Sequence, residues 1–162
     1  STLWKLKIPH KVQMFGWRIL HGIIPLKSKL TNMHIRSDGA CPICHQGVED
    51  VRHLLFDCMH ARELWNRLGM MDIIEEVMQV DYSGSIIMEH LLLQLAAPLL
   101  TKPSLDRTQV LMVGCWYLWW IRRQITHNEP YPLILRWPIF VLAIANNFHM
   151  AESRTAPHRD QR

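Results

Sequence analysis

The sequence predicts a mostly α-helical fold, and three observations lead to this prediction. Apolar side chains recur every three or four residues through most of the chain, which is the period of a helix with one buried face. Proline and glycine fall between these segments, where helices begin and end. The 162 residues are 49% hydrophobic and 20% charged, a composition that allows a globular domain of this length to bury a sizeable core.

The first half is expected to hold three helices. Residues 9–20 begin with a proline, which suits the first turn of a helix, and carry apolar side chains at helical spacing. Residues 25–33 again begin with proline and form a second, short helix. A Ser-Asp-Gly turn at 37–39 follows, and the third helix runs from about 60 to 68.

The second half is expected to be helical as well. Short helices are predicted around residues 73–78 and 86–95. The longest helix, about 105–126, can be capped by Ser104 or Asp106, whose side chains accept hydrogen bonds from the first free backbone N–H groups. A last helix opens at Pro138.

These elements divide into a small helical domain at 1–70, a C-terminal helical extension at 71–152 and a disordered tail at 153–162. Gly114 in the longest helix predicts a close approach by a neighbouring element, and Cys115 beside it is expected to pack in the core.

Three of the four cysteines fall within eighteen residues, 41–58. Cys41 and Cys44 form a C-x2-C loop, and His53 and Cys58 follow with eight and four intervening residues. Three thiolates and one imidazole suit tetrahedral Zn²⁺ and leave no coordination position open. The pattern therefore predicts a closed, structural Cys3His zinc knuckle around which the first domain folds.

Two other histidines compete for the fourth position. His45 follows Cys44 directly and would strain the loop, and His60 lies two residues beyond Cys58. Three ligating thiolates and a neutral imidazole carry a net charge of about −1, which Arg52 and Arg62 could offset. Chance proximity of the thiols is the alternative, although the turns supplied by Gly39, Pro42 and Gly47 argue against it.

At this point the sequence resembles a family, the reverse transcriptase zinc-binding domain of plant LINE-type non-LTR retroelements. The resemblance covers residues 3–68 and then the connector that follows this domain, seen here as WYLWWIRRQITHNE at 116–129. The residues that carry it, in order, are Leu3 to Val12, Phe15, Trp17, Arg18, Leu20, Ile24-Pro25, Leu30, Cys41, Cys44, Glu49-Asp50, His53 to Phe56, Cys58 and Trp65. The resemblance implies that Cys41, Cys44, His53 and Cys58 hold zinc. Neither the paired aspartates of the polymerase nor the acidic quartet of ribonuclease H is recognisable.

Charge is distributed unevenly along the chain. Residues 1–36 carry seven bases and no acid, residues 37–100 carry a net charge of −7, and the remainder carries +4. A basic stretch predicts a polyanion partner such as nucleic acid, whereas the alternative is a solvated face that complements the acidic middle of the same fold. The predicted nucleic-acid-binding residues are Lys5, Lys7, Lys11, Arg18, Lys27, Lys29 and Arg36. Trp4 or His10 could stack on an unpaired base, although core packing is the commoner role of such a tryptophan.

We therefore expect a non-catalytic zinc-binding module derived from a retroelement, which binds RNA or single-stranded DNA. The alternative is a structural or protein-interaction module, since the aromatic side chains of the extension exceed what one small core needs. These side chains are Trp116, Trp119, Trp120, Trp137 and Phe140. An enzyme is not expected, because no nucleophile has a recognisable partner. No signal peptide or membrane span is predicted, which places the protein in the nucleus or cytoplasm.

Overall fold

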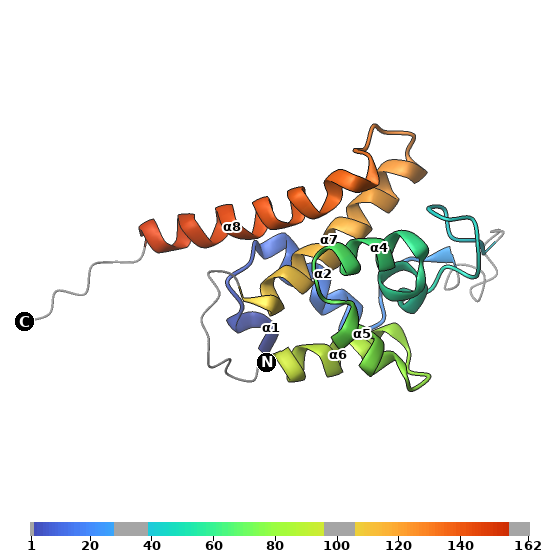
Figure 1. The fold of residues 1–162 in the computed structure, drawn as a ribbon, viewed down its shortest axis with the longest axis horizontal. Coiled ribbons are helices and arrows are strands. Elements are labelled where there is room, and N and C mark those ends of the chain that lie inside the picture. The colour runs from blue at the N-terminus through green and yellow to red at the C-terminus, as the bar shows by residue number, and fades with distance from the viewer. Residues whose placement is uncertain (1, 28–38, 96–105, 156–162) are drawn as a thin grey trace, which may run out of the picture.

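The computed structural model describes residues 2–27, 39–95 and 106–155, and within these the fold is helical without strands, as predicted (Figure 1). The expected helix at 25–33 lies mostly outside the described residues. The elements are α1 Thr2–Lys5, α2 His10–Leu20, η1 His53–Asp57, α4 Met59–Arg67, α5 Met71–Met78, α6 Gly84–Leu95, α7 Arg107–Thr126, η2 Ile134–Arg136 and α8 Trp137–Thr155.

Where the structure describes them, the predicted helices are present with boundaries close to those expected, but the short helical elements η1 and η2 were not predicted. The short helix α1 was not expected, and α2 begins one residue after Pro9, which has an extended conformation at the cap position. α8 runs to Thr155, three residues into the expected tail; the rest of that tail lies outside the described residues. At the start of α7, Asp106 is the cap, because its carboxylate accepts a 2.9 Å hydrogen bond from the Thr108 backbone N–H.

The long helix α7 is the centre of the fold. It crosses the body of the molecule beside α2, with α8 on one side and α5 and α6 on the other (Figure 1). All of its side chains from Thr108 to Cys115 are buried, including Cys115, as predicted. No helix in the described part of the chain is both long and apolar enough to cross a membrane.

One hydrophobic core joins residues on both sides of the expected boundary at 70. Trp65 of α4 lies fully buried against α7, and its indole N–H donates a 2.7 Å hydrogen bond to the Leu55 carbonyl. A Cβ atom at Gly114 would lie 2.6 Å from the Trp65 ring, so the predicted close approach at this glycine is confirmed. Segments 1–70 and 71–152 therefore fold against each other around a shared core.

Candidate metal centre

The cysteine loop is a tight antiparallel turn. Ala40 and Val48 form an isolated bridge, and the Cys41 N–H donates to the Gly47 carbonyl at 3.2 Å. Gly47 and His45 have φ near +60°, which is costly for a residue with a Cβ atom. His45 thus serves the turn through its backbone, and the loop folds so that Cys41 and Cys44 face the same point.

The second pair of candidate ligands comes from a turn of π-helix, η1. The Cys58 N–H donates a 2.7 Å hydrogen bond to the His53 carbonyl, five residues earlier. Such an i→i+5 bond brings the two ends of the turn next to each other, so both side chains can reach one site. Asp50 caps the start of the turn, since its carboxylate accepts a 2.7 Å hydrogen bond from the His53 N–H.

The structure brings the four predicted ligands together. One ligand atom each from Cys41, Cys44, His53 and Cys58 lies within 4.8 Å of the other three, and the Cys44 Sγ to His53 Nε2 distance is 3.2 Å. Zn–S bonds of about 2.3 Å at tetrahedral angles place sulfurs about 3.8 Å apart, so a cluster of this size fits the ion. His60 is not part of the group; its Nδ1 is 4.0 Å from the Cys58 Sγ and its ring packs near Trp137.

The two buried cysteines of the site affect each other's ionisation. Cys41 and Cys58 are fully buried, and the hydrogen bond between their sulfurs lowers the pKa of Cys41 to about 5 and raises the pKa of Cys58. Burial opposes ionisation of both thiols. Without a metal the pair therefore shares a proton, and a divalent ion would allow all three thiolates to form. Sulfur donors with one imidazole are a set that zinc prefers.

The arginines that were expected to offset the charge of the site are engaged elsewhere. Arg52 donates to the Val80, Tyr82 and Met78 carbonyls at 2.8–3.3 Å and pairs with Asp57, so it ties η1 to the loop between α5 and α6.

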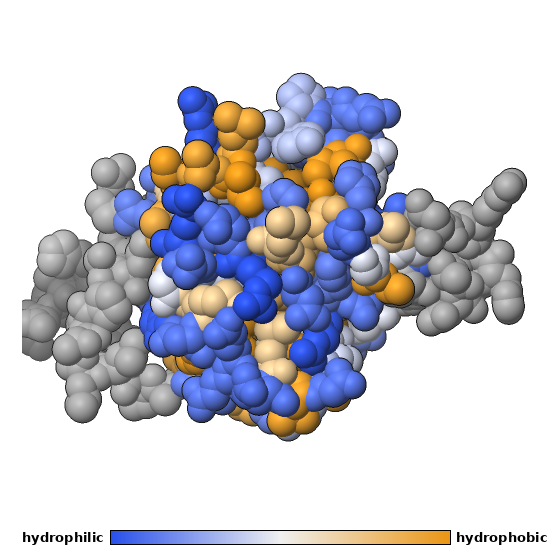
Figure 2. Space-filling view, turned by 45° about the vertical axis from the view of Figure 1, so that its right-hand side comes forward, coloured by the Kyte–Doolittle hydropathy of each residue, from blue (hydrophilic) through white to orange (hydrophobic). Residues whose placement is uncertain are grey.

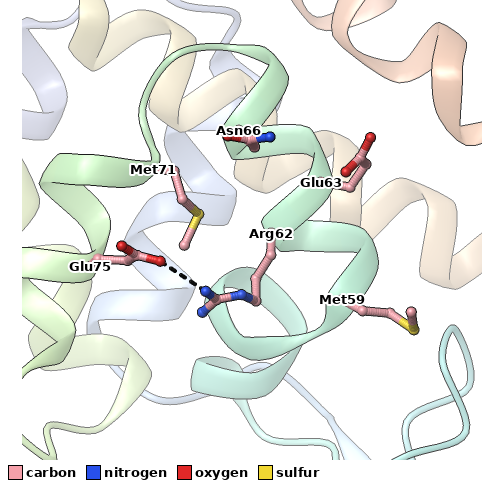
Figure 3. Close-up of a pocket in the computed structure, with 6 residues that line it drawn as sticks. All are labelled: Met59, Arg62, Glu63, Asn66, Met71 and Glu75. Carbon is pink, nitrogen blue, oxygen red and sulfur yellow. Dashed lines mark hydrogen bonds and ion pairs between the residues drawn. The ribbon is translucent and has the colours of Figure 1, made fainter.

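Arg62 forms a 2.8 Å ion pair with Glu75 of α5 (Figure 3). This pair spans a surface hollow of about 340 Å³ between α4 and α5, into which Met71 also points. Both side chains of the pair are about half exposed, so the ion pair adds little stability.

Sequence reasoning missed the role of Glu49. Its side chain is fully buried, and its two oxygens accept hydrogen bonds of 2.7 and 2.8 Å from the guanidinium of Arg122 in α7. The Lys27 backbone N–H donates to the same carboxylate at 2.9 Å. The zinc loop is therefore fastened to the extension by a bidentate buried ion pair across 73 residues of sequence. An arginine within the apolar run WWIRRQI was the available signal, because such a charge is buried only with a partner.

The predicted basic residues do not gather at the cysteine site. Lys5, Lys7, Lys11 and Arg18 lie exposed on or beside α1 and α2, and Lys27 is half-buried. Lys29 and Arg36 lie outside the described residues.

Of the aromatic candidates, Trp4 is 45% exposed, contrary to the expectation that core packing is its commoner role. It packs poorly because it occupies the outer side of the short helix α1, whereas Leu3 beside it is buried. His10, the other candidate for base stacking, is also exposed.

Comparison with known proteins agrees with this site. Residues 1–65 match the model of a family described as zinc-binding in reverse transcriptase. A ribonuclease H-like protein of Arabidopsis thaliana is 29% identical over 68 residues, which are 42% of this chain and 11% of that protein. The chain therefore corresponds to about a tenth of this relative. No solved structure matches.

The family match over residues 1–65 and the Cys3His geometry agree on one zinc-binding segment. The N-terminal part of this chain is therefore a reverse transcriptase zinc-binding domain.

Proposed function

We propose that this protein is a non-catalytic zinc-binding module of retroelement origin that binds RNA or single-stranded DNA through its basic N-terminal stretch. Cys41, Cys44, His53 and Cys58 are the proposed zinc ligands. Residues 1–70 form the zinc-binding domain in this proposal, and 71–152 form an extension that completes its core. The observation that carries the nucleic-acid role is the exposure of Lys5, Lys7, Lys11 and Arg18 on or beside α1 and α2, in a stretch of sequence without acids.

The zinc in this proposal is structural. Four protein ligands fill the tetrahedron, so no position is left for a water that could be activated. Two of the four ligand side chains, Cys41 and Cys58, are fully buried, so solvent does not reach the site on the side of these two ligands. The ion would hold the 41–58 loop in the shape that positions Glu49 for Arg122.

The basic surface supports a phosphate-binding role. Lys11 and Arg18 are seven residues apart and therefore lie on the same side of α2. Lys5, the last residue of α1, and Lys7, in the connection to α2, are also exposed. No acid occurs between residues 1 and 36, so nothing in this stretch opposes a polyanion. Each phosphate that such a surface neutralises releases counterions, which makes binding strongly dependent on salt.

A salt titration with matched variants tests this function. Zinc-loaded protein is titrated with labelled single-stranded RNA, single-stranded DNA and duplex DNA, and the logarithm of affinity is plotted against the logarithm of salt concentration. The double variant K5Q/K7Q should lower affinity and reduce the slope by about 0.7 for each phosphate of the single strand that is no longer neutralised. Arg136→Gln removes an exposed charge from η2 and serves as the control. Wild-type protein without salt-sensitive binding to any of the three would refute the proposal.

Protein interaction is a second candidate function, favoured by exposed apolar side chains in η2, just before it and on α8. Leu133 is 75% exposed and Ile139 65% exposed, and the others are Leu135, Phe140 and Leu142. Figure 2 shows exposed hydrophobic side chains in the upper part of the molecule. This is the level that α8 occupies in Figure 1, because the two views differ only by a turn about the vertical axis.

The tryptophans that the sequence indicated for this role differ in how deeply they are buried. Trp137 is buried, and Trp116, Trp119 and Trp120 pack partly against the core.

Sedimentation of the protein alone and of the double variant L133S/I139S tests this second candidate. Self-association that the variant abolishes would support it, and a monomer at all concentrations would remove the case for a second copy.

A further inference from the structure

The solvent-facing side of α7 has an unusual composition. Among the fifteen residues from Thr108 to Arg122, only Trp116, Trp119 and Trp120 are not fully buried. A surface helix normally shows water its polar side chains. Within this stretch of fifteen residues, the part of α7 that reaches solvent, here called the window, consists of the indole rings of Trp116, Trp119 and Trp120. Helical spacing then brings Arg123 and His127, both exposed, onto the same side as Trp116 and Trp120.

This window adjoins the basic stretch. The Lys11 ammonium lies 4.5 Å from the centroid of the Trp116 ring, and Phe15 of α2 stacks near Trp119 at 6.0 Å. Since α2 packs against α7, the positive surface of one helix continues into the indole surface of the other. The guanidinium of Arg122 also lies 5.2 Å from the Trp119 ring centroid, but this arginine is buried in its ion pair with Glu49 and adds no exposed cation.

A cavity of about 260 Å³ lies at the far end of the window. Trp120, Arg123, Gln124, His127 and Glu129 line it. The turn after α7 is fixed in place, because the Gln124 side chain donates to the Pro130 carbonyl at 2.8 Å and the Glu129 N–H donates to the Gln124 carbonyl at 2.8 Å. The His127 Nδ1–H donates to the Arg123 carbonyl at 2.8 Å, which leaves Nε2 as an acceptor in the neutral ring.

The mixture of groups in this cavity favours a base over a phosphate. An indole offers a surface for stacking, and a guanidinium can stack or donate to base edges. The carboxylate of Glu129 repels phosphate but accepts hydrogen bonds from the amino groups of bases.

We propose that a single nucleic-acid strand crosses from the basic stretch onto α7, stacks its bases on the Trp116–Trp120 window and places one base in the cavity at Trp120. This inference rests on the nucleic-acid function proposed above and adds its substrate class: unpaired strands are preferred over duplexes, whose bases are already stacked. It also gives the WYLWWIRRQITHNE segment a role that the zinc site does not explain.

Binding measurements with four variants test the inference. Trp120→Leu keeps apolar bulk but removes the ring, and should weaken single-strand binding about 5- to 100-fold with an unchanged salt slope. Arg123→Gln, at an exposed position, should weaken binding several-fold without affecting folding. Phe140→Leu and Arg136→Gln, which remove a ring and a charge outside the window, are the matched controls and should bind like wild type. Quenching of tryptophan fluorescence by the bound strand should fall in Trp120→Leu.

The outcomes separate this inference from the function on which it rests. Wild-type binding that weakens in K5Q/K7Q but not in Trp120→Leu or Arg123→Gln would overturn the window and leave the proposed function standing. Equal affinity for duplex and single strand would also overturn it. Failure of wild type to bind any nucleic acid would refute both. Loss of self-association in Trp120→Leu, with nucleic-acid binding unchanged, would assign the window to protein contact instead.

Discussion

The zinc loop and helix α8 are held to the rest of the molecule in different ways. The 41–58 loop combines a metal-ligand cluster, a buried ion pair and a hydrogen-bonded turn, all of which depend on particular atoms at particular distances. In α8, only one side carries fixed anchors such as Trp137 and Val141, which are buried, whereas Ile139 and Phe140 between them are exposed. Substitutions should therefore be severe in the loop and mild on the outer side of α8.

Removing a zinc ligand should have the largest effect. Cys41→Ser, or chelation of the metal from wild type, should unfold the zinc loop and reduce helicity, because binding energies of about 10–16 kcal/mol are typical of structural zinc sites. Circular dichroism and thermal melting measure the loss. Cys115→Ala is the control, since this buried cysteine lies outside the ligand group and its variant should retain zinc. Unchanged melting after complete metal removal would contradict a structural role.

Breaking the buried ion pair should cause the second-largest loss of stability. Glu49→Gln leaves the guanidinium of Arg122 buried without its carboxylate, which should lower the free energy of unfolding by about 3–5 kcal/mol. Urea unfolding measures this change. The double variant E49Q/R122M should recover part of the loss, because the unpaired charge is gone. Additive losses in the two single variants and the double variant would show that the pair is not coupled.

Adding a methyl group at Gly114 should reduce stability less than breaking the ion pair. In Gly114→Ala the new carbon would meet the Trp65 ring, so overpacking should lower the free energy of unfolding by about 1–3 kcal/mol. Combining it with Trp65→Phe, which makes room at the same contact, should give a smaller penalty than the sum of the two single variants. If Gly114→Ala were as stable as wild type, α4 and α7 would not be in close contact at this position.

Substitutions on the outer side of α8 should have the smallest effect on stability. Ile139→Asn replaces a side chain that is 65% exposed and should change the free energy of unfolding by no more than about 0.5 kcal/mol. Val141→Asn, two residues further along on the buried side, is the matched comparison and should be strongly destabilising. Similar losses in both would show that the exposed side of α8 is covered in solution.

Local sequence patterns predicted most helices because each depends on neighbours in the chain. The Asp106 cap of α7 and the spacing of Cys41, Cys44, His53 and Cys58 involve short-range geometry that a sequence displays directly. The contacts of Glu49 and of Trp65 could not be predicted, because their partners, Arg122 and Gly114, lie far along the chain and only the tertiary fold brings them together.

The dependence of contacts on the tertiary fold also explains why the expectations for Arg52, Arg62 and Trp4 were wrong. Arg52 and Arg62 lie close to the zinc ligands in sequence, but carbonyls and a carboxylate from α5 and the loop after it engage them. The exposure of Trp4 depends on which side of a four-residue helix faces the core, and so short a segment shows no hydrophobic period.

X-ray absorption spectroscopy at the zinc edge, on purified protein with its metal content measured in parallel, tests the metal centre most directly. We expect one zinc per chain with three sulfur neighbours at about 2.3 Å and one nitrogen at about 2.0–2.1 Å. Protein that contains no stoichiometric zinc, or a zinc surrounded only by nitrogen and oxygen, would contradict the Cys3His site.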